Sequence, residues 1–150
     1  MTIPRAIKFL FALLIGFVVW FVVATLANML IRASLSGYAE AELATRFTLP
    51  MLLARLVVGG VSSVAAGLAC ALSARSVPVV VKVFAAALVL FFIPVHYSLW
   101  TQFPLWYHAT FLVSLAPLVL VGAWVARRFA SGVAGAAPSA APKIPLDHKP

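Results

Sequence analysis

Long apolar runs with few charges dominate the pattern of hydrophobic and polar positions along this chain. A helix needs about 20 mainly apolar residues to cross the hydrocarbon core of a bilayer. Four runs reach that length. We therefore predict four membrane-spanning helices, over residues of about 9–31, 50–72, 77–96 and 105–126.

Prolines and arginines mark where these runs begin and end. Pro50, Pro78 and Pro104 lie near the starts of the second, third and fourth runs. Proline is tolerated in the first turn of a helix, where its missing N–H has no partner to lose. Arg127 and Arg128 close the fourth run. The pattern predicts an all-α fold, an integral membrane four-helix bundle with short loops.

Two segments lie outside the four runs. Residues 38–47 favour helix, and Glu42 precedes Arg46 by four residues, a spacing that stabilises a helix. We expect a short interfacial helix there. Residues 130–150 are rich in alanine, proline, glycine and serine, which predicts a disordered tail. Residues 1–129 then form a single membrane domain.

Composition excludes several classes of protein. The chain is 65% hydrophobic and only 9% charged, whereas a soluble domain carries about 25% charged residues. A soluble fold and a disordered chain are both excluded. The net charge of +8 comes from basic residues that flank the apolar runs, so it does not indicate a nucleic-acid partner. Cys70 is the single cysteine and has no partner for an intramolecular disulfide.

The basic residues predict the orientation. Most of them fall on the side of the membrane that holds both termini, and only Arg32, Arg46 and Arg55 fall on the other side. Basic segments stay in the cytoplasm, so we expect both termini to be cytoplasmic, in a bacterium at the inner membrane. A cleaved signal peptide is the competing interpretation of the first run, which is longer than a usual signal-peptide core.

The second run contains a ridge of small residues spaced four apart. Such a ridge lets helix backbones approach closely within a bilayer. It predicts either packing inside the bundle, which we favour, or a face for self-association. The residues of the ridge are Gly59, Ser63, Gly67 and Ala71.

Four further residues are expected to act as interfacial anchors: Trp100, Trp106, Tyr107 and Arg55. Tryptophan and tyrosine favour the headgroup zone, and an arginine near the end of a span can reach lipid headgroups. An alternative for Arg55 is that it binds an anion or pairs with Glu40 or Glu42.

His96 and His108 flank the turn between the third and fourth runs. Two imidazoles that meet at a membrane interface could ligate a haem or a metal, or bind a quinone headgroup. No third metal ligand lies near them in the sequence, so we expect no metal site, and a haem or quinone is an alternative to interfacial anchoring.

Absences in the sequence narrow the function further. The predicted spans contain no Asp or Glu, which argues against a proton-coupled carrier, and no catalytic motif is present. We expect a non-enzymatic accessory or self-associating membrane protein, with lipid, itself or a larger membrane complex as partner. One alternative is a haem- or quinone-binding electron-transfer subunit that uses the two histidines. Another is a small channel or carrier lined by Ser62, Ser63, Ser73 and Thr25.

Overall fold

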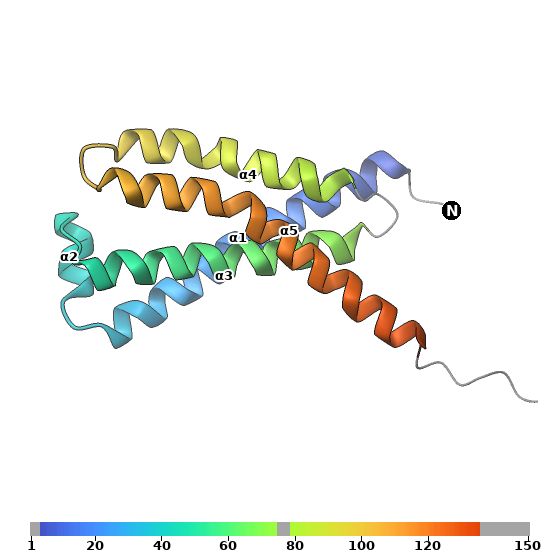
Figure 1. Cartoon of the computed structure of the whole chain (residues 1–150), viewed down its shortest axis with the longest axis horizontal. Coiled ribbons are helices and arrows are strands. Elements are labelled where there is room, and N and C mark those ends of the chain that lie inside the picture. The colour runs from blue at the N-terminus through green and yellow to red at the C-terminus, as the bar shows by residue number, and fades with distance from the viewer. Residues whose placement is uncertain (1–3, 75–78, 136–150) are drawn as a thin grey trace, which may run out of the picture.

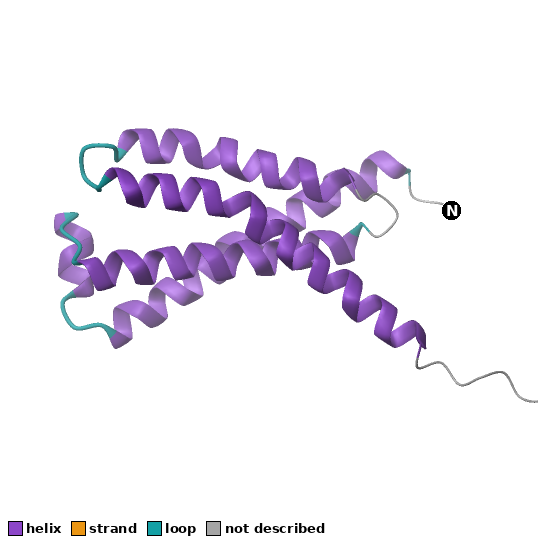
Figure 2. Cartoon of the chain, in the orientation of Figure 1, coloured by secondary structure: helices purple, strands orange, loops and turns teal. Residues whose placement is uncertain are grey.

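The computed structural model describes residues 4–74 and 79–135. Within these ranges every regular element is a helix, which confirms the predicted all-α bundle (Figure 2). The five helices are α1 (Arg5–Ser34), α2 (Tyr38–Ala44), α3 (Leu49–Ser73), α4 (Val79–Ser98) and α5 (Leu105–Gly135).

The four long helices, α1, α3, α4 and α5, are each long and apolar enough to cross a membrane. Their order matches the four predicted spans, and each contains the core of the corresponding apolar run. Their outer faces expose large apolar side chains, as lipid-facing surfaces do. The chain is therefore a helical membrane protein with four candidate spans.

Successive long helices run in opposite directions (Figure 1). The short helix α2 and the turn at 99–104 lie together at one end of the bundle, which we call the α2 end. The start of α1 and the end of α5 lie at the opposite end (Figure 1). An even number of candidate spans places them there.

The helix α2 is shorter than the predicted 38–47. It ends at Ala44 because Thr45 adopts a left-handed backbone conformation with φ 52°. Arg46 therefore lies beyond the helix, and its backbone N–H donates to the carbonyl of Ala41. The helical pairing of Glu42 with Arg46 that we expected does not form, and Glu42 contacts other arginines instead.

The helix α5 is longer than predicted. It continues to Gly135, into the first residues of the segment expected to be a disordered tail. The expectation for residues 136–150 lies outside the described residues. Residues 129–135 contain no proline, so each of them can continue the backbone hydrogen bonding of the helix.

The central helix α3 packs against both α1 and α5. Its closest approach is to α5, where Gly67 faces the backbone of Val119 and Gly122 faces the backbone of Val64. A Cβ atom on either glycine would overlap the facing carbonyl oxygen. Figure 1 shows α5 bent near its middle, and Pro117 inside this helix explains the bend.

Large apolar side chains fill the rest of the core. Phe84 of α4 is fully buried and lies over Gly16 of α1, where a Cβ would come within 2.8 Å of its ring. Trp20 of α1 reaches across to α3 and donates from Nε1 to the Ser63 hydroxyl at 3.1 Å. These contacts hold α1 against α3 and α4.

The helix crossing predicts a difference between two glycines of α3. Gly67→Ala should destabilise the folded protein by about 1–3 kcal/mol, because the added methyl overpacks a backbone contact. Gly60→Ala is the matched control, since its Cβ would lie at 3.4 Å from one Leu118 methyl, an ordinary contact. Unfolding of the two variants in detergent measures the difference, and equal stabilities would contradict this account of the crossing.

Candidate functional site

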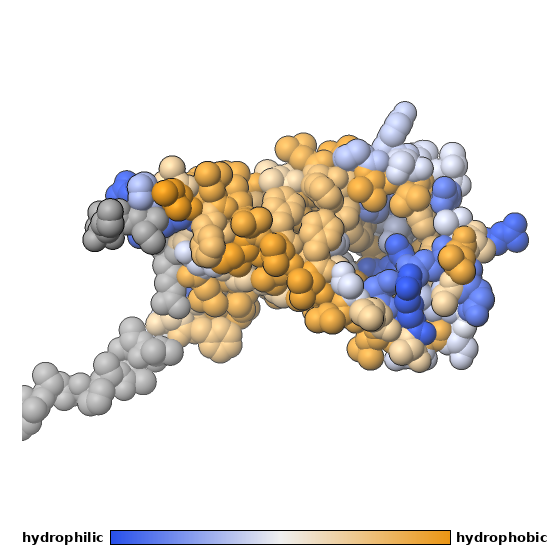
Figure 3. Space-filling model, turned by 180° about the vertical axis from the view of Figure 1, so that it is seen from behind, coloured by the Kyte–Doolittle hydropathy of each residue, from blue (hydrophilic) through white to orange (hydrophobic). Residues whose placement is uncertain are grey.

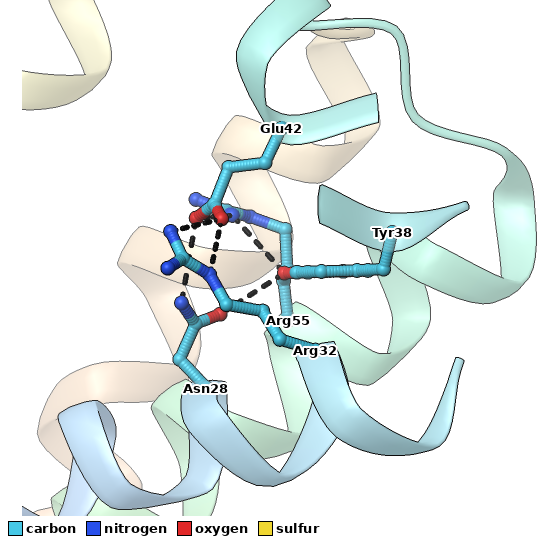
Figure 4. A network of polar contacts seen from close by, with 5 residues as sticks. All are labelled: Asn28, Arg32, Tyr38, Glu42 and Arg55. Atoms are coloured by element: carbon cyan, nitrogen blue, oxygen red, sulfur yellow. Dashed lines mark hydrogen bonds and ion pairs between the residues drawn. The ribbon is translucent and has the colours of Figure 1, made fainter. Parts of the chain in front are cut away.

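A polar network joins α1, α2 and α3 at the α2 end (Figure 4). Its centre is the Glu42 carboxylate, which accepts a hydrogen bond from Arg32 Nε at 2.6 Å and forms an ion pair with the same guanidinium. The carboxylate also accepts from Asn28 Nδ2 at 3.3 Å. Arg32 and Asn28 both come from the last turns of α1, so Glu42 fixes α2 onto that helix.

Tyr38 connects this network to α3. Its side chain is fully buried. The hydroxyl donates to Asn28 Oδ1 at 3.1 Å and accepts from Arg55 Nη1 at 3.2 Å, so it uses both of its hydrogen-bonding roles. Gly37 precedes it with φ 75°, a left-handed conformation that favours glycine and starts α2 in the required direction.

Arg55 lies in the first half of α3, and its side chain turns into the protein. Its Nη1 is 3.7 Å from Glu42 Oε1, and its guanidinium carbon stacks 4.8 Å from the centre of the Phe47 ring. The side chain is 28% exposed. Its Nε is buried and has no hydrogen-bond partner. Arg55 thus makes the contact with Glu42 that was the alternative to a headgroup anchor.

The two histidines meet, as their positions on either side of the turn indicate. His96 Nδ1 and His108 Nδ1 are 2.8 Å apart, a hydrogen-bond distance. Both residues are buried, at 5% and 1% exposed. Aromatic rings enclose them, with Trp100 stacked on His108 and Phe111 tilted against His96. One Nδ1 must donate and the other accept, so a single proton lies in the hydrogen bond between the two rings.

This geometry does not fit a haem whose iron is held between the two rings. Metal–nitrogen bonds of about 2.0–2.1 Å would place two ligands on opposite sides of the metal at about 4 Å from each other. The two Nδ1 atoms face each other at 2.8 Å and satisfy one another. Within the described ranges, no group of three His, Cys, Asp or Glu residues lies close enough to hold a metal ion.

A cavity of about 190 Å³ lies between the polar network and the histidine pair. Its polar lining comes from α1, α2, α3, α4 and α5, and its apolar lining combines aromatic and aliphatic side chains. Figure 3 shows hydrophilic residues gathered at this end of the molecule beside a hollow in the surface. The polar lining residues are Asn28, Glu42, Arg55, His96 and Tyr107, and the aromatic ones are Trp20, Phe92, Phe103 and Phe111.

The small-residue ridge lies inside the bundle. Gly59 faces the Phe111 ring of α5, Ser63 accepts from Trp20 of α1, and Gly67 faces the Val119 backbone. Ala71, partly buried, packs against the core. Because α1 and α5 cover the ridge, it does not present a free face for a second copy.

The expected aromatic anchors differ in exposure. Trp100 and Trp106 are 52% and 41% exposed, as anchors at an interface would be. Tyr107 is only 4% exposed, so it lacks the access to headgroups that we predicted. The reason is its position on α5, where it stacks against His96 and packs with Phe103.

The polar residues suggested as a pore lining do not converge. Ser62, Ser63 and Ser73 each donate to the carbonyl four residues earlier in their own helix. Ser62 and Ser63 are fully buried, whereas Thr25 lies on the exposed side of α1. These hydroxyls line no common channel in the part of the chain that the structure describes.

Sequence reasoning missed most of the polar network. It named Glu42 only as a partner of Arg46 or Arg55, and it gave Tyr38 and Arg32 no role at the site. Tyr38 did carry a signal, because it lies close in sequence to Glu40 and Glu42, two of the three acids of the chain. Nothing in the sequence indicated that α2 lies close enough to the end of α1 for Glu42 to contact Asn28 and Arg32.

In comparisons with known proteins, no family model, curated protein or solved structure matches this chain. Any role assigned to the cavity therefore comes from its own geometry.

The histidine pair predicts a distinctive nuclear magnetic resonance signature. In protein labelled with ¹⁵N at histidine, one Nδ1 of the pair should be protonated and the other not, with scalar coupling across the hydrogen bond. His108→Phe should remove the coupling and, by leaving His96 Nδ1 unpaired, destabilise the fold by about 1 kcal/mol. Two unprotonated Nδ1 atoms would contradict the pairing.

Proposed function

We propose that this protein is a non-enzymatic membrane protein that binds a small amphipathic molecule in the cavity at the α2 end. The ligand's head carries oxygen atoms that accept hydrogen bonds, and its apolar part lies along the aromatic walls. The observation that carries the proposal is the cavity itself, which combines convergent polar groups with an apolar lining, the usual character of a small-molecule site.

The polar groups in the cavity favour a ligand that accepts hydrogen bonds. Arg55 is donor-only, and its buried Nε has no partner in the protein. His96 has its Nδ1 engaged with His108, which leaves Nε2 as its remaining ring nitrogen. A ligand oxygen in the cavity can therefore accept a hydrogen bond from the part of the Arg55 guanidinium that lines it, and can pair with His96 Nε2.

The volume of the cavity favours an amphiphile over a free solute. At about 190 Å³ it is smaller than the 300–1,000 Å³ of usual ligand sites. It accommodates a head and the first part of a chain, and the remaining chain extends along the bundle into lipid. A bilayer supplies such molecules at high local concentration.

The sequence suggested a quinone, a haem and an accessory role as candidates, and they fit this proposal to different degrees. A quinone has carbonyl oxygens and an apolar tail, so it belongs to the proposed ligand class, with His96 as the contact and His108 behind it. A haem held by both histidines does not fit. An accessory role in a larger membrane complex is compatible, because a ligand-binding subunit can serve such a complex through its exposed apolar faces.

The same proposal places both termini in the cytoplasm and the cavity in the outer half of the membrane. The support is the excess of basic residues on the side of the termini. After residue 150, a fused reporter that functions only in the cytoplasm should be active, and one that functions only outside should be inactive. In the 99–104 turn the two reporters should give the opposite result. The reverse pattern would overturn the orientation.

The cavity predicts which substitution abolishes ligand binding. Ala24 of α1 lines the cavity, so Ala24→Phe should fill it. Thr25→Phe is the matched control, because Thr25 is exposed on the same helix. Native mass spectrometry of protein extracted gently from its membrane should show added ligand mass in the wild type and the control, and loss of at least about 90% of it in Ala24→Phe.

The same spectra report the oligomeric state and any partner subunit. Bare protein in all three samples, or a complex with another subunit that carries no small ligand, would contradict ligand binding and favour a purely structural accessory role.

A further inference from the structure

The charges around the cavity do not balance. Two guanidinium groups, Arg32 and Arg55, share the single carboxylate of Glu42. That carboxylate is closer to Arg32, with which it forms both a hydrogen bond and an ion pair, and it lies 3.7 Å from Arg55. Glu40, the other acid of α2, is exposed and forms no ion pair in the described structure. The described site therefore carries about one unit of net positive charge.

The uncompensated charge belongs to Arg55, which lines the cavity. Phe47 covers one side of its guanidinium, and Tyr38 accepts from one of its five N–H donors. The buried Nε has no partner. A half-buried cation inside a candidate span is costly unless it is paired. An anionic oxygen group in the cavity would supply the missing negative charge beside this guanidinium.

The histidine pair supplies a second donor. His108 Nε2 is buried among aromatic rings without a partner. A buried N–H without an acceptor is rarer than a lone pair without a donor, so the proton of His108 lies on Nδ1, from which it donates to His96 Nδ1. His96 then carries its own proton on Nε2. This tautomer makes His96 a hydrogen-bond donor at the wall of the cavity.

We infer that the cavity binds a single-chain anionic amphiphile, whose carboxylate or phosphate oxygens contact Arg55 and His96. This inference rests on the proposed function and narrows it from any oxygen-bearing head to a charged one. Arginine binds such oxygens through pairs of parallel hydrogen bonds. The apolar chain lies against Phe92, Val95 and Phe111, which line the same cavity.

The test compares four ligands whose apolar chains have ten or twelve carbons. Dodecanoate, dodecyl phosphate, dodecanol and a neutral benzoquinone with a ten-carbon chain are titrated into the full-length protein in nanodiscs of neutral phosphatidylcholine. Tryptophan fluorescence reports binding through Trp20, which lines the cavity. The anions should bind about tenfold or more tightly than dodecanol, since hydrogen bonds to a charged group are the stronger kind. The better of the two anions identifies a carboxylate or a phosphate head.

Matched variants separate the site from general surface charge. Arg55→Gln should weaken anion binding about tenfold or more, and Arg55→Lys should restore part of it, because lysine keeps the charge but loses the paired donors. Arg46→Gln removes an exposed arginine near the same end and should leave binding unchanged. Glu42→Gln should strengthen anion binding, because it removes the competing carboxylate; this opposite sign distinguishes a charge effect from damage to the fold.

Other outcomes overturn the inference in distinguishable ways. Binding of the quinone or dodecanol as tight as that of the anions, lost in Ala24→Phe, would leave the proposed function standing and remove the anionic head. Equal losses in Arg46→Gln and Arg55→Gln would assign binding to surface charge. If none of the four ligands binds, and native mass spectrometry shows no difference in ligand mass between the wild type and Ala24→Phe, the proposed function is overturned as well.

Discussion

The contact on which the bundle depends is the crossing of α3 and α5, where two glycines bring backbone against backbone. Gly67 of α3 and Gly122 of α5 each face a carbonyl of the opposite helix, and neither position has room for a Cβ atom. In lipid, apolar side chains gain no hydrophobic free energy by association, so close packing has to hold the helices together. The bend at Pro117 directs the second half of α5 across α3 (Figure 1).

The same arrangement produces the cavity. Beyond the crossing, towards the α2 end, aromatic side chains rather than glycines separate the helices, as Phe111 does where it lies over Gly59. A cavity of about 190 Å³ lies among these side chains. The helix α2 lies at this end and is fixed by the hydrogen bonds of Glu42 and Tyr38 to α1 and α3. The crossing of α3 and α5 thus sets the positions of the polar groups around the cavity at the α2 end.

An arginine inside a membrane span needs a compensating environment. Arg55 obtains part of it from the Phe47 ring, the Tyr38 hydroxyl and a share of the Glu42 carboxylate. The two buried histidines also need hydrogen-bond partners, and each imidazole is the partner of the other. The polar side chains around the cavity are therefore paired through contacts between helices, and Arg55 and His96 both line the cavity.

By itself, the sequence determined the fold class and the number of long helices, because apolar length is read directly from the chain. It also indicated the small-residue ridge of α3, since a spacing of four places residues on one helix face. Tertiary structure alone decided that Gly122 completes the crossing, that Glu42 contacts Arg32 rather than Arg46, and that Tyr107 is buried. The physical reason is that each of these depends on the relative rotation and bend of two helices, which no periodicity within one helix specifies.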